Sequence, residues 1–319
     1  MTLRIAQIGT GHGHAAGKWL ALRGNPDVEA VGVWEADPLR RHADRFAGAR
    51  WFASVAEVLA DPTIVAVAIE TRNHQSLSIA TQVVQAGKHL WFDKPAGDDW
   101  PTFAQLMQHA AERSLHVQLG YMFRYSPGFE KIWELVHSGQ LGHVFEVRAH
   151  MSTSIDIVER TEQSRHRGGI LFDLGGHMID QLVWLLGRPT RVSAAFGNHA
   201  TPERPDYSDN SACVLEFPGA LGIIDIAAME SPPTSRRFEV YGTLGSAILE
   251  PFDASSQLRW VHDKSVEIVE LPPLQRQELY ERELVAFVAV LRGERKPDRT
   301  PEHELLVQET LLRATGRLG

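Results

Sequence analysis

Short apolar runs alternate with amphipathic segments along the first 120 residues. Five of the runs are rich in β-branched side chains, which is typical of strands buried on both faces of a parallel sheet. They read LRIAQIG, VEAVGVW, TIVAVAI, KHLWF and HVQLG. Between them, Ser54 and Glu57 form a capping-box pattern, and an apolar helical stripe precedes Gly87. The members of that stripe are Leu77, Ala80, Val83 and Val84. This alternation predicts an α/β fold with a doubly wound parallel sheet.

The pattern changes after residue 122. Two helical segments, GFEKIWELVHSGQLG and GGILFDLGGHMIDQLVWLLG, are followed by seven strand patterns with no helix between them. Successive strands without helices indicate an antiparallel sheet, and the FPGA corner predicts a hairpin. A last segment, ELYERELVAFVAVLRG, returns to a helical period. We therefore expect two domains, residues 1–122 and an α+β domain over 123–319.

Composition narrows the class of protein. A chain of 319 residues that is 43% apolar is long enough for two cores. The net charge of -8 and the absence of a basic tract argue against a nucleic-acid partner. The single cysteine, Cys213, argues against disulfides and cysteine-rich zinc sites. No apolar stretch reaches the roughly 18 residues of a membrane span, and the N-terminus shows no export signal, so we expect a cytoplasmic protein.

The stretch IAQIGTGHGHAAG carries the first candidate site. Gly9 and Gly11 follow a strand and open a helix, which is the context of a dinucleotide-binding turn. Gly9 permits the tight turn, Gly11 lets the backbone approach a pyrophosphate, and the helix N-terminus offers N–H groups to the anion. His14 replaces the third glycine of the G-x-G-x-x-G pattern. The predicted cofactor contacts here are Gly9, Thr10, Gly11, His12, Gly13 and His14.

Glu35 strengthens this prediction because it lies 22 residues after Gly13, at the end of the second strand pattern. An acidic residue there accepts hydrogen bonds from the adenosine ribose and repels a 2′-phosphate, which favours NAD. Arg40 and Arg41 leave NADP open. Two other interpretations remain. The stretch is a plain glycine corner, or its histidines bind a metal together with distant ligands; we expect no metal.

Two further segments carry chemistry. Asp93, Lys94 and Pro95 directly follow the fourth strand pattern, where the carboxyl ends of parallel strands face a ligand crevice. The proline restricts the backbone of Lys94, whose ammonium suits a substrate oxygen or a ribose hydroxyl. Asp173 and His177 are four residues apart and share one helix face. The alternatives are a surface lysine, a structural Asp–His pair, or a metal site that combines this pair with His12 or His14.

Together these segments resemble the glucose–fructose oxidoreductase / inositol dehydrogenase / MocA family along nearly the whole chain. The similar segments are IGTGHGH, AIETRNHQSLSIATQVVQAGKHLWFDKP, GYMFRYSPGF, GGILFDLGGHMIDQLVWLLG and FEVYGTLGSAILE. The chain departs from the family pattern at Arg72, Ser76 and Asp93, where proline, histidine and glutamate are usual. The resemblance implies a Rossmann domain, a C-terminal α+β domain with a large open antiparallel sheet, and a homo-oligomer, dimer or tetramer, formed through that sheet.

The resemblance also implies hydride transfer between a nicotinamide cofactor and a carbon bearing oxygen in a sugar, inositol or related polyol. In the mechanism that we expect, His177 is the general base and Lys94 donates to the same substrate oxygen. Asp173 orients the substrate or supports the protonation states of Lys94 and His177. Lys94 as the proton acceptor is a variant of this scheme. Further expected cofactor contacts are Thr71, Arg72, Asn73, Asp93, Lys94 and Arg124. Further expected substrate contacts are Arg165 and Arg167.

Two other functional classes stay open. The first is a dinucleotide-binding sensor of the same fold that regulates a partner without turnover. The second is a metal-dependent hydrolase or isomerase that uses His12, His14, Asp173 and His177. The presence of all three expected catalytic residues favours the dehydrogenase.

Overall fold

The structure is a computed structural model that describes residues 2–41, 44–254 and 257–318. It divides into two compact units. Unit 1 comprises Met1–Gly120 and Gln277–Leu305, and unit 2 comprises Tyr121–Arg276 and Leu306–Gly319. The second segment of unit 1 falls within the range 123–319 that the sequence analysis assigns to the second domain. The expected domain ranges themselves stay a prediction.

Unit 1 is built on a parallel five-stranded sheet. Its strands are β1 (Leu3–Ile8), β2 (Val28–Trp34), β3 (Ala66–Ile69), β4 (His89–Phe92) and β5 (Val117–Leu119). They lie in the order β2-β1-β3-β4-β5, and every pairing is parallel. All five coincide with the apolar runs, and β3 is buried along its whole length. The prediction of a doubly wound parallel sheet is confirmed.

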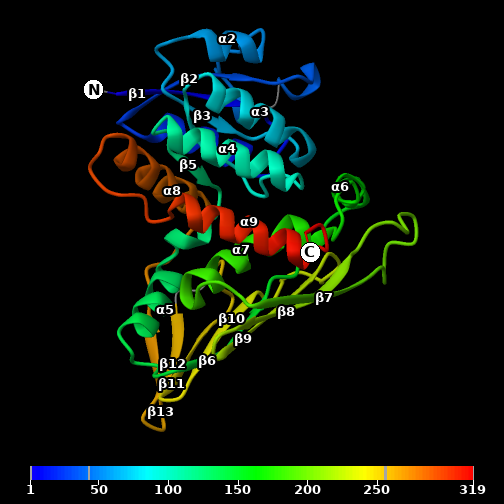
Figure 1. Cartoon of the computed structure of the whole chain (residues 1–319), viewed down its shortest axis with the longest axis vertical. Coiled ribbons are helices and arrows are strands. Elements are labelled where there is room, and N and C mark those ends of the chain that lie inside the picture. Colours follow the sequence, from blue (N-terminus) through cyan, green and yellow to red (C-terminus); the bar gives the residue numbers. More distant parts are fainter. Residues whose placement is uncertain (1, 42–43, 255–256, 319) are drawn as a thin grey trace. The chain divides into compact units, whose positions relative to one another are not determined.

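The helices of unit 1 follow local signals in the sequence. They are α1 (Ala15–Gly24), α2 (Val55–Ala60), α3 (Asn73–Gln85), α4 (Trp100–Glu112) and α8 (Arg276–Leu291). The capping box is confirmed, because Ser54 Oγ accepts the Glu57 N–H at 3.1 Å and Glu57 Oε2 accepts the Ala53 N–H at 2.7 Å. The predicted apolar stripe of α3 is buried. Figure 1 shows α3 beside α4. The sequence analysis did not predict the helix α4.

Unit 2 contains a large, mostly antiparallel sheet. Its strands are β6 (Val144–His150), β7 (Arg191–Gly197), β8 (Asn210–Phe217), β9 (Ala220–Ala227), β10 (Arg237–Gly242), β11 (Gly245–Leu249), β12 (Gln257–His262) and β13 (Ser265–Glu270). Their order is β13-β12-β11-β10-β6-β9-β8-β7. The predicted hairpin is confirmed, since Phe217 faces Ala220 across the β8–β9 turn. One pairing, β6 with β9, is parallel, because the helices between β6 and β7 allow a crossover.

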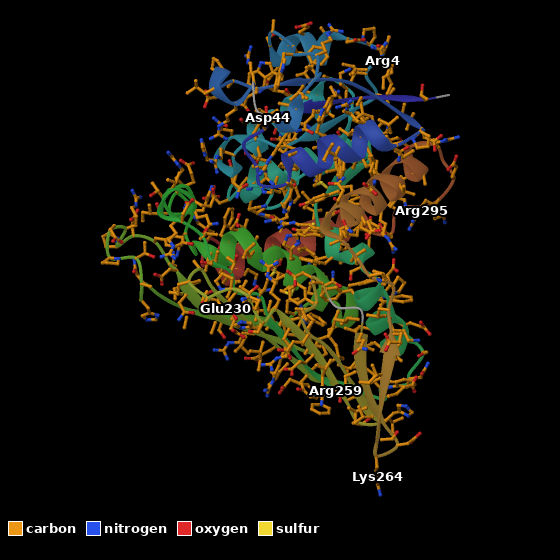
Figure 2. All side chains as sticks on the ribbon, turned by 180° about the vertical axis from the view of Figure 1, so that it is seen from behind. Arg4, Asp44, Glu230, Arg259, Lys264 and Arg295 are labelled. Carbon is orange, nitrogen blue, oxygen red and sulfur yellow. The ribbon has the colours of Figure 1, made fainter. Side chains whose placement is uncertain are left out.

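The helices of unit 2 are α5 (Pro127–His137), α6 (Ile157–Gln163) and α7 (Ile170–Leu186), with a 3-10 turn η3 at Met122–Tyr125. The helix α9 (Pro301–Ala314) begins in the segment assigned to unit 1 and ends in unit 2. The helix α5 contacts β11 of the sheet. The helix α7 packs on β8 and β9. A Cβ at Gly222 of β9 would lie 2.4 Å from Leu182 of α7, so the glycine permits this close approach. Figure 2 shows Lys264 at the tip of the β12–β13 hairpin, pointing away from the sheet.

No helix among the described residues combines the length and the apolar character that crossing a membrane requires.

Candidate active site

The β1–α1 turn has the geometry expected of a nucleotide-binding turn. Gly9 has φ +94°, and a Cβ on it would lie 2.5–2.7 Å from atoms of Thr71 and Glu70. Glycine is therefore required where the turn meets the segment after β3. A Cβ on Gly11 would lie 2.9 Å from the Arg40 side chain, whereas one on Gly13 would meet nothing within 4 Å. The turn is thus closely packed at Gly9 and open at Gly13, the residue before the start of α1.

Glu35 lies beside this turn, directly after β2. Its Oε2 atom accepts hydrogen bonds from the N–H and the hydroxyl of Thr10, both at 2.7 Å. Its Oε1 atom accepts the Asp37 N–H at 3.0 Å, and its side chain is buried. A carboxylate has about four lone-pair sites, so acceptor capacity remains for a ribose hydroxyl. The turn and Glu35 together fit the adenosine and pyrophosphate part of a dinucleotide.

Asp93 and Lys94 follow β4, as predicted, and both side chains are buried. The Lys94 N–H donates to Asp93 Oδ1 at 2.8 Å. Asp93 Oδ2 lies 2.9 Å from His14 Nδ1 and 3.3 Å from His12 Nδ1. The carboxylate of Asp93 therefore joins the nucleotide turn to the loop that carries Lys94. Burial lowers the pKa of His14 to about 3, so its imidazole is neutral at pH 7.

A buried charge cluster, consisting of Lys18, Glu70, Asp93 and Glu283, lies at this edge of the sheet. Lys18 Nζ is 3.1 Å from Asp93, 3.2 Å from Glu70 and 3.9 Å from Glu283. Burial opposes the charge of Lys18, but the three carboxylates outweigh it and raise its pKa. Burial and the neighbouring Asp93 raise the pKa of Glu70 well above its ordinary value, and burial raises that of Glu283 to about 7. Burial also opposes the charge of Asp93, but His12, His14 and Lys18 hold its pKa well below the usual range.

Sequence reasoning missed three members of the charge cluster, namely Lys18, Glu70 and Glu283. A signal existed for Lys18, because it falls on the same helical face as Ala15, Trp19 and Leu22, all of which are buried. A lysine on an apolar stripe indicates a buried partner. Glu70 directly follows the buried strand β3 and offered a weaker signal of the same kind.

The helix α7 in unit 2 carries Asp173 and His177, which confirms that both lie on one helix. His177 is buried, and its ring centroid lies 5.1 Å from that of Phe123 and 6.2 Å from that of Tyr121. Asp173 Oδ2 accepts a hydrogen bond from Gln163 Nε2 at 3.1 Å. Gln163 Oε1 in turn accepts the Tyr207 hydroxyl at 2.6 Å, a chain of contacts that sequence reasoning did not predict.

The candidate arginines have different environments. Arg124 is buried, and it donates to Asp180 through Nη2 at 2.5 Å and Nε at 3.2 Å. Its guanidinium also lies 3.9 Å from the ring centroid of Trp184. Arg165 is exposed and pairs with Glu162 at 3.2 Å. The predicted cofactor contact of Arg124 and the substrate contact of Arg165 both stay predictions.

The remaining predicted cofactor residues, Thr71, Arg72 and Asn73, follow the carboxyl end of β3. Thr71 is one of the two residues that pack closely against Gly9. The metal alternative combined His12 and His14 with Asp173 and His177. The structure places the first two residues in unit 1 and the last two in unit 2.

Comparison with known proteins identifies the class of protein that this fold and this site define. Residues 3–121 match the oxidoreductase family with an NAD-binding Rossmann fold. Residues 129–248 match the GFO/IDH/MocA C-terminal domain. The chain belongs to the Gfo/Idh/MocA family of NAD(P)-dependent oxidoreductases, which confirms the family predicted from the sequence.

Individual relatives span most of the chain. An uncharacterised oxidoreductase, ORF334, of Rhizobium meliloti is 30% identical over 71% of this chain and 68% of its own length. A myo-inositol 2-dehydrogenase of Thermotoga maritima is 25% identical over 76% of this chain and 74% of its own length. The crystal structure of an NAD-binding oxidoreductase from Klebsiella pneumoniae superimposes with a TM-score of 0.87 at 18% identity, covering 99% of this chain and 96% of that one. That last likeness supports the fold alone.

Proposed function

We propose that this chain transfers a hydride between NAD and the hydroxyl-bearing carbon of a sugar, inositol or related polyol. The observation that carries the proposal is the position of Glu35 and Lys94. Glu35 directly follows β2, and Lys94 is the second residue after β4 of the same parallel sheet. Ligands of such sheets bind at the carboxyl ends of the strands. The relative from Thermotoga maritima, named as a myo-inositol 2-dehydrogenase, supports a polyol as the substrate class.

The preference for NAD rests on Glu35. Its carboxylate is held by Thr10 beside the turn, where it would accept hydrogen bonds from a ribose and repel a 2′-phosphate. Arg40 and Arg41 are the residues that would favour NADP. Arg40 lies near Gly11 but pairs with Asp37 at 3.4 Å, and Arg41 Nε donates to the backbone carbonyl of Glu35 at 2.8 Å. We therefore expect NAD to bind more tightly than NADP.

The chemistry separates into a hydride and a proton. NAD, when bound, supplies the acceptor for the hydride that leaves the substrate carbon. The hydroxyl proton of the substrate passes to His177, because imidazole is the side chain that most often acts as a general base in enzymes. Lys94 donates a hydrogen bond to the same oxygen as the carbonyl forms. Asp173, held by Gln163, orients the substrate.

A substrate panel tests the proposal. Polyols, sugars and sugar acids would be mixed with the purified chain and either NAD or NADP, and the absorbance of reduced nicotinamide would be followed. We expect turnover with at least one polyol class and a preference for NAD. Tight dinucleotide binding without turnover on any member of the panel would favour the sensor alternative instead.

Separate substitutions test the catalytic residues. Lys94→Ala and His177→Ala should each lower turnover by about 10²–10⁴-fold, the usual contribution of a positioned proton-transfer group. Lys264→Ala, at the exposed hairpin tip, and His137→Ala, on the exposed surface of α5, serve as matched controls and should keep wild-type turnover. Wild-type turnover in either of the first two variants would refute the assigned role.

The open sheet of unit 2 supports the proposal of a homo-oligomer. Val214 of β8 and Leu221 of β9 are 36% and 43% exposed, although both are large and apolar. Val214 pairs with Ile223, two residues beyond Leu221, so all three side chains are on one face of the sheet. Light scattering coupled to gel filtration should report a dimer or tetramer. Leu221→Glu should shift it towards the monomer.

A further inference from the structure

Three side chains of unit 1 converge in a way that the dehydrogenase chemistry does not require. His12 and His14 come from the β1–α1 turn, and Asp93 follows β4. One donor atom from each, His12 Nδ1, His14 Nδ1 and a carboxylate oxygen of Asp93, lie within 4.8 Å of one another. Among the described residues, this is the one group of three or more histidine, cysteine or acidic side chains whose potential ligand atoms lie close enough to share a metal ion. His14 and Asp93 are buried, and His12 is 10% exposed.

The distances between these atoms match the edges of a metal polyhedron. Asp93 Oδ2 is 2.9 Å from His14 Nδ1 and 3.3 Å from His12 Nδ1. Ligand atoms about 2.0–2.2 Å from a tetrahedral zinc ion are roughly 3.3–3.6 Å apart. Of the two edges that include Asp93, the one to His12 already matches, and the one to His14 needs to lengthen by only a few tenths of an ångström. Two imidazoles and one carboxylate are also the donor set that suits zinc and its neighbours in the first transition row.

His12 Nδ1 has a single lone pair, which accepts a backbone N–H in this structure, and binding of an ion through this atom would replace that hydrogen bond. His12 Nδ1 accepts the backbone N–H of His14 at 3.2 Å. A nitrogen that accepts this bond carries no proton to donate to Asp93 Oδ2, which is also an acceptor. A third acceptor, Glu70 Oε2, lies 3.6 Å from the same nitrogen. Acceptors that face one another in a buried site are stabilised by a cation between them.

Glu70 provides a second, independent indication. Its side chain is completely buried, and its Oε2 atom accepts no hydrogen bond that meets geometric criteria from the described part of the chain. Its Oε1 atom lies 3.2 Å from Lys18 Nζ, while its Oε2 atom is directed towards His12. A buried carboxylate is costly without compensating charge, and a cation held by the trio would supply that charge.

The balance of charge around the trio points the same way. Four buried acidic side chains surround two buried basic ones, Lys18 and Arg299, in a continuous set of ion pairs; the acids are Glu70, Asp93, Glu283 and Glu304. Acidic side chains therefore outnumber basic ones in this set, and a cation beside Asp93 would lie in a favourable electrostatic environment. The second oxygen of Asp93 accepts the Lys94 N–H at 2.8 Å, which orients the carboxylate as a supporting contact orients a metal ligand.

We propose that His12, His14 and Asp93 bind one divalent ion of the zinc class between the β1–α1 turn and the loop that carries Lys94. Glu70 balances the charge of the ion, and Lys18 remains paired with Glu70 and Glu283. The ion links the β1–α1 turn to the segment after β4. The inference does not depend on the substrate or on hydride transfer, so it stands or falls separately from the proposed function.

Metal binding to the full chain tests the proposal without any assay of turnover. The protein would be treated with a chelator, dialysed and titrated with Co²⁺ while its visible d–d absorption is recorded. We expect one equivalent of Co²⁺ to bind with the strong absorption of a low-coordinate site, and one equivalent of Zn²⁺ to displace it. Zn²⁺ should also raise the unfolding temperature of the chain, because it binds only the folded site.

Variants locate the site. His14→Ala and Asp93→Asn should each weaken Co²⁺ binding by more than about 100-fold, since loss of a mere supporting contact already costs about 10–100-fold. His109→Ala, on α4 of the same unit, is the matched control and should bind as the wild type does. Far-UV circular dichroism would verify that each variant is folded.

Two results would overturn the proposal. One is a wild-type chain that shows neither cobalt absorption nor a zinc-dependent shift in unfolding temperature. The other is a folded His14→Ala variant whose affinity equals that of the His109→Ala control. The wild-type measurement decides the question even if a variant fails to fold. Anomalous diffraction from a zinc-soaked crystal provides a further readout, with the expected peak between His12, His14 and Asp93.

Discussion

The two units place their ionisable side chains in different environments. In unit 1, Lys18, Glu70 and Glu283 are completely buried at one edge of a parallel sheet. In unit 2, His150 pairs with Asp225 and Glu230 on the large sheet, and these three side chains are 27%, 51% and 22% exposed. A buried ion pair depends on each partner to offset desolvation, whereas a solvated pair gains little from its partner.

This comparison teaches that similar-looking ion pairs have different consequences. Removing one partner in unit 1 leaves the others buried and uncompensated. Removing one partner in unit 2 leaves the others partly in water. The effects expected below differ in size, and for the histidines also in sign, because the two environments differ.

The largest effect is expected for Lys18→Met. It leaves three buried carboxylates without their shared ammonium, so the free energy of unfolding should fall by about 3–5 kcal/mol. Arg148→Met removes the ion pair with Glu146 from the exposed face of the large sheet and should lower the free energy of unfolding far less, because water already solvates both charges. Urea titration followed by tryptophan fluorescence measures both. Equal losses of unfolding free energy in the two variants would show that burial does not distinguish the ion pairs of the two units.

A smaller effect is expected on acidification of unit 1, through His116. Burial lowers its pKa from 6.5 to about 4, so the folded chain keeps it neutral while the unfolded chain takes up a proton. Stability should therefore fall as the pH drops from about 6.5 towards 4, by at most about 3 kcal/mol from this residue. His116→Phe keeps a ring beside Phe287 and should flatten that part of the pH profile. An unchanged slope in the variant would show that other groups cause it.

The smallest effect is expected for His150 in unit 2 and has the opposite sign. Burial opposes its charge, but Asp225 and Glu230 outweigh it and raise its pKa. The pairing should therefore stabilise the fold below the ordinary pKa of about 6.5 and be lost as the pH rises through the raised value. His150→Gln should remove a shallow loss of stability as the pH rises above about 6.5. The measurement is the difference in unfolding temperature between variant and wild type at several pH values.

Local patterns predicted most of the fold. The five buried runs of unit 1 and the seven successive strand patterns of unit 2 all became strands, because burial on one or two faces leaves a direct trace in the spacing of apolar residues. The helix α9 left no such trace. Its buried positions include Glu304, Gln308 and Thr310, so the stripe that marks an amphipathic helix is interrupted by polar side chains.

Part of the candidate site was also readable. Gly9 and Glu35 directly follow strands of one sheet, and Lys94 is the second residue after another of its strands; strand–helix alternation determines that such positions share an edge. The partners of Asp93 were not readable. It was predicted as a cofactor contact, and the structure shows its carboxylate in contact with His14, His12 and Lys18.

The sequence alone thus determined the two kinds of sheet, the glycine turn and the residues that follow the strands, because each depends on neighbours a few positions away. Only the tertiary structure decided that Lys18, Glu70, Asp93 and Glu283 form one buried cluster. Apolar periodicity is a local property of the chain. Coulomb interaction acts through space, and positions 70 and 283 become neighbours of position 18 only when the sheet and its helices have assembled.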